Sequence, residues 1–168
     1  MDVTHPDPQR TYRVAASRRI EAPAAAVYGV FADYREAHPR ILPTSFFGPL
    51  VVEQGGYGAG TIIRVEGRVA GRSRFLRGIV TEPEPGRLLV ESYPEDRMVT
   101  SFRVEAEPGG GACTATITTD SPRPSGIAGW IEERVARWIL ARVFREELEL
   151  VAAYVAAEPR GEGKKSSS

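Results

Sequence analysis

The chain has 168 residues, of which 42% are hydrophobic and 26% are charged, and this balance fits one globular domain rather than a disordered chain. Basic and acidic residues number 22 each, so no net positive charge favours nucleic acid, and we expect none as a partner. The single cysteine, Cys113, excludes an internal disulfide and cysteine-rich zinc motifs. His5 and His38 are not at metal-ligand spacing, so we expect no metal site and no cofactor.

Both ends of the chain are polar and lack periodicity, which predicts flexible tails at 1–11 and 158–168 around one domain at 12–157. The start has no basic segment followed by an apolar one, as a signal peptide would have. No stretch approaches the length of uncharged apolar residues that a membrane helix needs. We therefore expect a cytoplasmic protein without a membrane span.

The first elements are a strand and two short helices. Alternating apolar residues predict a strand over Tyr12–Ile20. Pro23 then suits the first turn of a helix, where a missing N–H has little cost. A second short helix is expected after Asp33 up to His38, because Pro39 should stop it.

From Phe46 onward the apolar pattern has a period of two, with glycine- and proline-rich turns between the runs. The runs predict six strands at 46–54, 61–69, 73–82, 87–93, 99–107 and 112–119. No helical pattern intervenes, so the strands should form an antiparallel meander. Ile127–Ala157 then reads as one long helix of about 45 Å, which must cross the sheet.

The apolar stripe of this long helix changes direction near Ile139. Its second half is expected to lie against the sheet. For the first half, which contains Trp130 and Trp138, three alternatives remain open. It covers the mouth of a pocket, it bends near Ile139, or it meets a second subunit in a homodimer.

Alternation leaves the inward face undecided in two of the strands. If Phe75, Arg77 and Ile79 face inward on one, and Glu91 and Tyr93 on another, then Arg77, Glu91 and Tyr93 are polar groups in an apolar cavity. Otherwise Arg77 and Glu91 form a cross-strand pair facing solvent. For His38 we favour a local hydrogen bond over general acid/base catalysis.

The order of elements and several short motifs resemble the helix-grip superfamily, which includes the START lipid-transfer domains and the birch-pollen-allergen proteins. The bacterial polyketide cyclase/dehydrase-like branch looks nearest. The motifs are Arg19–Pro23 leading into Val27–Asp33, Gly58–Thr61, Val80–Pro83 and Pro85–Leu88. The resemblance covers about Tyr12 to Ala157. It implies an α+β helix-grip fold, with the elements in the chain order β-α-α-β6-α. In this fold a curved antiparallel seven-stranded sheet wraps around the C-terminal helix.

A sheet wrapped around a helix encloses a space that side chains either fill or line. The first functional hypothesis is therefore binding of a small, mostly apolar ligand such as a lipid, isoprenoid or polyketide. The expected ligand-binding residues are Phe31, Ile63, Val65, Phe75, Ile79, Tyr93, Phe102, Val104, Ala115, Ile117, Trp138, Ala141, Phe144 and Leu148. One alternative is a polyketide cyclase or dehydratase, with Arg77, Glu91 and Tyr93 as candidate catalytic residues that orient an enolate. Another is a protein-interaction scaffold with a filled interior.

Overall fold

The structure is a computed structural model that describes residues 11–69 and 72–158. The expected tails lie outside these residues, apart from Thr11, which begins the first strand, and Glu158, which follows the last helix. The elements are β1 (Thr11–Ile20), α1 (Ala24–Ala32), α2 (His38–Ile41), β2 (Phe47–Gln54), β3 (Ile62–Val69), β4 (Arg72–Glu84), β5 (Leu88–Tyr93), the 3-10 turn η1 (Pro94–Asp96), β6 (Met98–Ala106), β7 (Cys113–Pro122) and α3 (Gly126–Ala157).

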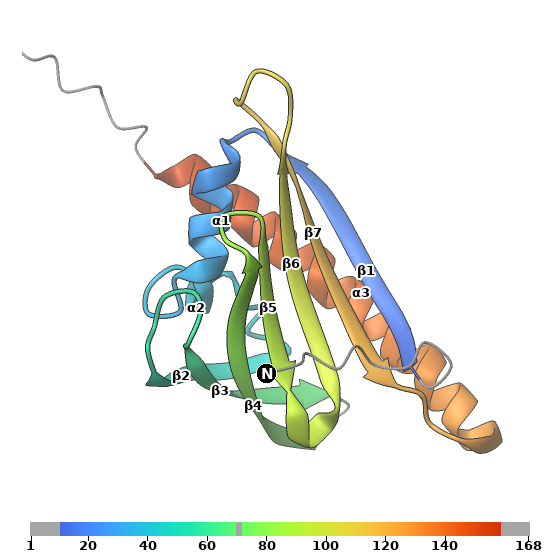
Figure 1. The fold of residues 1–168 in the computed structure, drawn as a ribbon. Helices are drawn as coiled ribbons and strands as arrows, with labels where there is room; N and C mark the ends of the chain where they lie inside the picture. Colours follow the sequence, from blue (N-terminus) through green and yellow to red (C-terminus); the bar gives the residue numbers. More distant parts are fainter. Residues whose placement is uncertain (1–10, 70–71, 159–168) are drawn as a thin grey trace, which may run out of the picture.

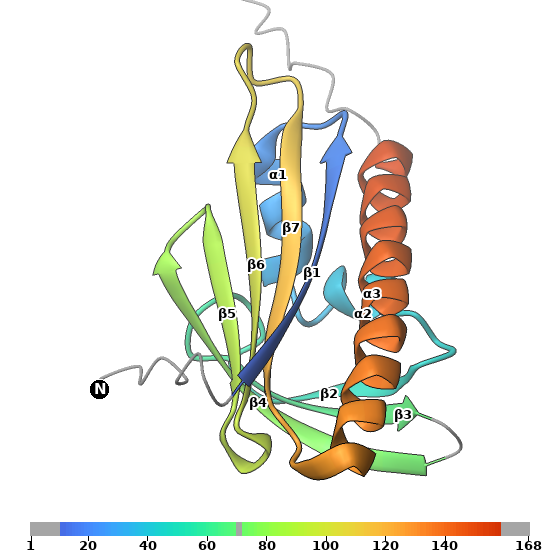
Figure 2. The same ribbon diagram turned by 90° about the vertical axis from the view of Figure 1, so that its right-hand side faces the viewer.

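The strands form one antiparallel sheet of seven strands in the order β1-β7-β6-β5-β4-β3-β2. The sheet is strongly curved, and α3 lies along its concave side, with β2, β3 and β4 turned across one end of the helix (Figures 1 and 2). Sequence neighbours β1 and β2 occupy opposite edges of the sheet, because α1 and α2 connect them across its concave face. The expected helix-grip architecture is confirmed.

The second short helix differs from the expectation. It begins at His38 rather than ending there, and Pro39 occupies its first turn. A proline is favourable at this position because the first N–H groups of a helix have no partner within the helix. Pro39 therefore belongs to the start of α2, and the preceding residue, His38, is 2% exposed.

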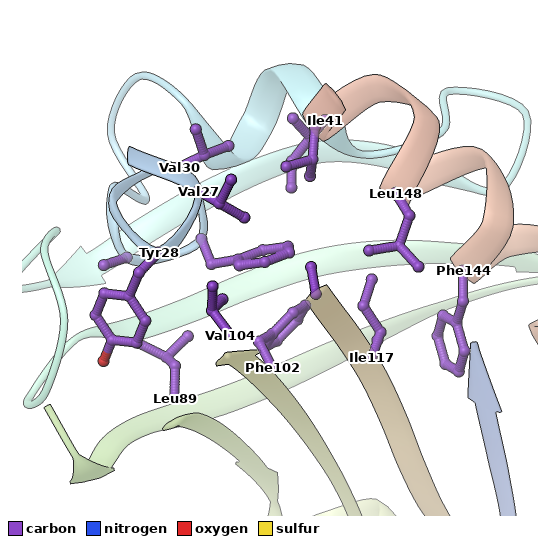
Figure 3. Close-up of a cluster of buried hydrophobic side chains, with 14 of the residues drawn as sticks. Val27, Tyr28, Val30, Ile41, Leu89, Phe102, Val104, Ile117, Phe144 and Leu148 are labelled. Atoms are coloured by element: carbon purple, nitrogen blue, oxygen red, sulfur yellow. The ribbon is translucent and has the colours of Figure 1, made fainter. Parts of the chain in front are cut away.

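A hydrophobic core fills the end of the fold where α1 and α2 pack against the sheet and the C-terminal half of α3 (Figure 3). Phe31 from α1 contacts Phe102 from β6, with ring centroids 4.9 Å apart. Leu148 and Phe144 from α3 close this core from the opposite side. At the other end of the fold, no helix packs between the concave face of β2–β7 and the N-terminal half of α3 among the described residues.

The pairing of β3 with β4 decides the inward face that alternation left open. Val69 pairs with Arg72, so Phe75 pairs with Glu66 and Arg77 with Arg64. Side chains of directly paired residues lie on the same face of the sheet. A turn one residue longer between β3 and β4 would have placed each side chain of β4 on the opposite face. Phe75 is therefore 67% exposed on the outer face of the sheet.

Two further residues that we expected in the cavity lie on the same outer face as Phe75. Ile79 is exposed, and Arg77 donates a hydrogen bond of 2.7 Å to Glu53 on β2. Both halves of the expectation for Arg77 are thus wrong, because it neither enters a cavity nor pairs with Glu91.

The first half of α3 carries an apolar stripe that points in a different direction from the stripe of the second half. The helix is continuous from Gly126 to Ala157 (Figure 2). Ile139 and the half-exposed Val135 line the cavity described below, whereas Ile127, Trp130 and Trp138 are exposed to solvent and do not line it. Within the described ranges, no helix is both long and apolar enough to cross a membrane.

Candidate ligand-binding cavity

A cavity of about 1000 Å³ lies between the N-terminal half of α3 and the concave face of β2–β7. Its apolar lining comes from both layers: Leu42, Phe46, Phe47, Leu50, Ile63, Val65, Leu76, Met98, Phe102, Val135, Ala136, Ile139, Leu140, Val143 and Phe144. Small-molecule sites are typically concave and mostly apolar, with a few convergent polar groups that fix orientation. This cavity has both properties, since buried polar groups stand at its inner end.

The main polar group of the cavity is a cluster formed by Glu91, Tyr34, Tyr93 and His38, here called the Glu91 cluster. Tyr34 donates a hydrogen bond of 2.6 Å to Glu91 Oε1, and Tyr93 donates one of 2.6 Å to Glu91 Oε2. His38 Nε2 lies 3.8 Å from Glu91 Oε1, which is too long for a hydrogen bond. The carboxyl of Glu91, 4% exposed, thus accepts a hydrogen bond from a tyrosine at each of its two oxygens.

Three separate parts of the fold position this cluster. Glu91 and Tyr93 are two residues apart on β5 and so point to the same face of the sheet. Tyr34 follows α1, and its ring stacks on His38 with centroids 4.5 Å apart. His38 Nδ1 donates to the Phe31 carbonyl oxygen at 2.7 Å, as expected for a local hydrogen bond, and this contact fixes the ring.

Gly78 on β4 makes room for the Tyr93 ring. A Cβ atom at Gly78 would lie 2.9 Å from Tyr93 Cε1 and 3.1 Å from Ile63 Cγ1, closer than side chains normally approach. The ring of Tyr93 therefore occupies the space that a side chain at position 78 would need. Burial, together with the nearby Glu91 carboxyl, raises the pKa of both Tyr34 and Tyr93 well above the usual value, so both keep the protons that they donate.

A second carboxyl, that of Glu147 on α3, lines the same cavity. Glu147 is 3% exposed, and its Oε1 atom has no hydrogen-bond partner among the described residues. Burial is the main cause that raises the pKa of Glu147 well above its usual value, and the charge of Glu91 adds to it. A buried polar atom without a partner is rare and points to a role beyond packing.

The remaining polar lining includes a threonine pair, two arginines, and Ser73, Asp96, Ser121 and Glu132. Thr100 on β6 and Thr119 on β7 share a hydrogen bond of 2.7 Å across neighbouring strands. Arg68 and Arg74 lie at the rim, where their side chains are 48% and 65% exposed and pair with Glu66 and Asp96. The arginines of the lining are thus neutralised at the mouth, while the two carboxyls lie inside.

The structure sorts the expected ligand-binding residues into three groups. Those that line the cavity are Ile63, Val65, Tyr93, Phe102 and Phe144. Those packed into the core without facing the cavity are Phe31, Val104, Ala115, Ile117, Ala141 and Leu148. Those on the outside are Phe75, Ile79 and Trp138, for the reasons of register and helix direction given above. Of the candidate catalytic residues, Glu91 and Tyr93 meet in the cavity and Arg77 does not.

The sequence interpretation missed Tyr34 and Glu147, and it expected the local hydrogen bond of His38 but not the place of its ring in the cavity wall. A signal for Glu147 was present, because it stands four residues after Val143 and four before Val151 on the apolar stripe that faces the sheet. A carboxylate on the apolar stripe of a helix becomes buried when that stripe packs against the sheet. Tyr34 gave no comparable signal, since its partner Glu91 is far away in the sequence.

Metal ligands are not gathered in this site. No group of three or more histidine, cysteine, aspartate or glutamate side chains able to hold an ion occurs in residues 11–69 and 72–158. His5 lies outside the described residues.

Several solved structures have the same fold as this chain. The KanY protein (ms6282) is 25% identical, with a TM-score of 0.76 over 88% of this chain and 99% of that one. The Zhui aromatase/cyclase from Streptomyces sp. R1128 is 19% identical, with a TM-score of 0.71 over 91% and 98%. A START superfamily protein from Mycobacterium smegmatis is 12% identical, with a TM-score of 0.66 over 86% and 97%. A search of curated proteins found no match.

A family model described as "Polyketide cyclase / dehydrase and lipid transport" matches residues 11–156, which is nearly the whole chain. The matched segment runs from the start of β1 into the last turn of α3 and includes every residue of the Glu91 cluster and Glu147. The chain therefore belongs to the polyketide cyclase/dehydrase and lipid transport family.

Proposed function

We propose that the protein binds a small, mostly apolar molecule in the cavity, with the polar end of the ligand beside the Glu91 cluster and Glu147. The observation that carries the proposal is a cavity of about 1000 Å³ whose walls are mainly apolar and whose buried polar groups converge at one end. Each methylene buried there would contribute about 0.8 kcal/mol. Family membership and the likeness to an aromatase/cyclase support a ligand-binding or cyclase role.

The alternative of an interaction scaffold assumed a filled interior. The open cavity removes that assumption, because neither the sheet nor α3 supplies side chains that occupy the space. Lipid, isoprenoid and polyketide ligands all remain candidates for binding, and they differ in the group that each would place against the buried carboxyls.

Uptake of pyrene, followed through its fluorescence, tests the proposal. We expect binding in the micromolar range or tighter. Ala136, which lines the cavity from α3, is replaced in Ala136→Trp, and Ala153, exposed on the same helix, serves as the control in Ala153→Trp. Ala136→Trp should weaken binding at least about tenfold, while Ala153→Trp should bind like the parent. Equal binding by the parent and both variants would place the binding elsewhere and refute the proposal.

A second candidate function, dehydration during cyclisation, is favoured by the presence of two carboxyls in one cavity. Loss of water from a β-hydroxy ketone needs a base that takes a proton from carbon and an acid that protonates the departing hydroxyl. Glu91, held by two tyrosine donors, suits the base, and Glu147, whose pKa is raised by burial, suits the acid. The C–O bond breaks as the C=C bond forms, water leaves, and the proton gained by Glu91 returns to Glu147 through solvent.

The two functions differ in one measurement. For an enzyme, Glu91→Gln should abolish conversion of a polycyclic β-hydroxy ketone to the enone, followed by absorbance, while binding of the ketone remains. For a binding protein, the parent itself should bind the ketone and leave it unchanged.

A further inference from the structure

We propose that Glu147 selects the ligand, so that the cavity accepts a neutral molecule with a hydroxyl group at its buried end and rejects one that ends in a carboxylate or phosphate. This inference rests on the proposed binding function and specifies the ligand class for that same cavity. Three features of the cavity point to this selection: an acceptor without a donor, lining arginines that lie only at the rim among the described residues, and a carboxyl that can both donate and accept a hydrogen bond.

The first observation is the difference between the two buried carboxyls. Both oxygens of Glu91 already accept hydrogen bonds, one from Tyr34 and one from Tyr93. Glu147 Oε1 accepts none from the described residues, and although Glu147 lines the cavity, this oxygen is itself buried, so a ligand would reach it only when the carboxyl group turns toward the cavity. A buried acceptor without a donor destabilises the protein, and a ligand that brings a donor removes this cost. Of the two carboxyls, that of Glu147 is the one that lacks a hydrogen-bond donor among the described residues.

The second observation concerns charge. Of the described residues that line the cavity, the arginines are Arg68 and Arg74, and both lie at the rim in ion pairs with Glu66 and Asp96. The imidazole of His38 also lines the cavity, but its Nε2 atom already lies 3.8 Å from Glu91 Oε1. An anionic ligand end placed beside Glu91 and Glu147 would therefore lose its hydration, meet two acidic groups and compete with Glu91 for this imidazole. The inner end of the cavity thus disfavours free fatty acids and phosphorylated lipids in the buried orientation.

The third observation concerns which neutral group fits. Burial raises the pKa of the Glu147 carboxyl, and in its protonated form this carboxyl offers one donor and one acceptor side by side. A hydroxyl group can both donate to Oε1 and accept from the carboxyl proton. An ether or a bare hydrocarbon cannot donate, and would leave Oε1 as unpartnered as it is without a ligand.

Three probes of the same size test this inference: 1-hydroxypyrene, 1-methoxypyrene and 1-pyrenecarboxylate, each titrated at neutral pH through pyrene fluorescence. In the parent, we expect 1-hydroxypyrene to bind at least about tenfold tighter than 1-methoxypyrene, and 1-pyrenecarboxylate to bind weakest. In Glu147→Leu, the preference for hydroxyl over methoxy should fall to less than about twofold. In Glu147→Gln, which keeps an acceptor oxygen, the preference should largely remain.

Glu149→Leu is the matched control, because Glu149 lies on the same helix with a side chain that is 65% exposed. It should keep the full preference of the parent. Circular dichroism verifies that each variant is folded, and Glu147→Met, which keeps the length of the side chain, replaces Glu147→Leu if the latter does not fold.

The possible results distinguish a failure of ligand selection by Glu147 from a failure of the proposed binding function. If the parent binds all three probes equally, or if the preference survives in Glu147→Leu or Glu147→Met, the cavity function stands and the role of Glu147 is refuted. If the parent binds none of the probes, the proposed binding function fails, and the inference fails with it.

Discussion

The hydroxyl of Tyr34 donates a hydrogen bond of 2.6 Å to Glu91 Oε1, joining the segment after α1 to the inner face of β5. Tyr34 is fully buried and lies behind the cavity wall, whereas Glu91 faces the cavity. Tyr34 therefore acts on a ligand only through Glu91, as a positioning residue. The hydrogen bond also ties the helical layer to the sheet at the boundary between the packed core and the open cavity.

Tyr34→Phe should lower the free energy of unfolding by about 1–3 kcal/mol, because it removes a donor from a buried carboxyl. Urea denaturation measures the change. Tyr57→Phe is the control, since Tyr57 is 64% exposed, and it should change stability by less than about 0.5 kcal/mol. Equal midpoints for both variants would show that the Tyr34 hydroxyl does not support the Glu91 carboxyl.

Glu147 should make stability depend on pH. Its pKa in the folded protein lies well above the ordinary value of 4.5 that applies in the unfolded chain. Between these two values the folded protein holds the extra proton, so this group's contribution to stability falls as pH rises from about 4.5 until Glu147 ionises in the fold, by at most about 1.4 kcal/mol per pH unit. Below both values it contributes no pH dependence.

Glu147→Gln removes the titrating group and isolates this effect. The stability of the variant relative to the parent, measured in urea at several pH values, should increase as pH rises above about 4.5. A difference that stays constant with pH would contradict the raised pKa of Glu147.

Gly78→Ala should destabilise the protein by about 1–3 kcal/mol, because the new methyl group displaces the Tyr93 ring. The control is Gly67→Ala on the neighbouring strand β3, where the added Cβ would lie 3.5 Å from Leu76 Cδ1, an ordinary contact. Gly67→Ala should therefore have a much smaller effect in the same urea experiment. If Gly78→Ala is as stable as Gly67→Ala, the ring of Tyr93 is not held in the way described.

The tryptophans should not report on the cavity, contrary to what the sequence suggested for Trp138. Trp130 is 59% exposed and Trp138 is 63% exposed, and neither lines the cavity. Acrylamide should quench most of the tryptophan emission, both without ligand and with saturating 1-decanol. Strong protection from acrylamide by 1-decanol would indicate that α3 rearranges when a ligand enters.

Much of the fold could be predicted because its signals are local. The alternating runs and the turn residues between them define the strands, and the uninterrupted segment after Gly126 defines α3. The face of β4 could not be predicted in this way. It depends on whether two or three residues connect Val69 to the next paired residue, and that difference of one residue moves Phe75 from one side of the sheet to the other.

The candidate site was predictable in part for a related reason. Glu91 and Tyr93 lie on one short strand, so their shared direction follows from alternation alone. Tyr34 and His38 reach Glu91 through the packing of α1 on the sheet and of α2 on α1 and α3, which depends on contacts between distant segments. The hydrogen bonds of the cluster therefore became visible only in three dimensions.

Because α3 is continuous, it sets a length scale for whatever enters the cavity. On α3, Val135 lines the exposed rim of the cavity and Glu147 lines its buried inner end. These residues are twelve positions apart on the helix, which corresponds to about 18 Å. A rigid molecule of this length could touch the inner carboxyl and still reach the rim. A shorter one would be wholly enclosed, and a longer one would leave its far end in solvent, open to any reagent or partner outside.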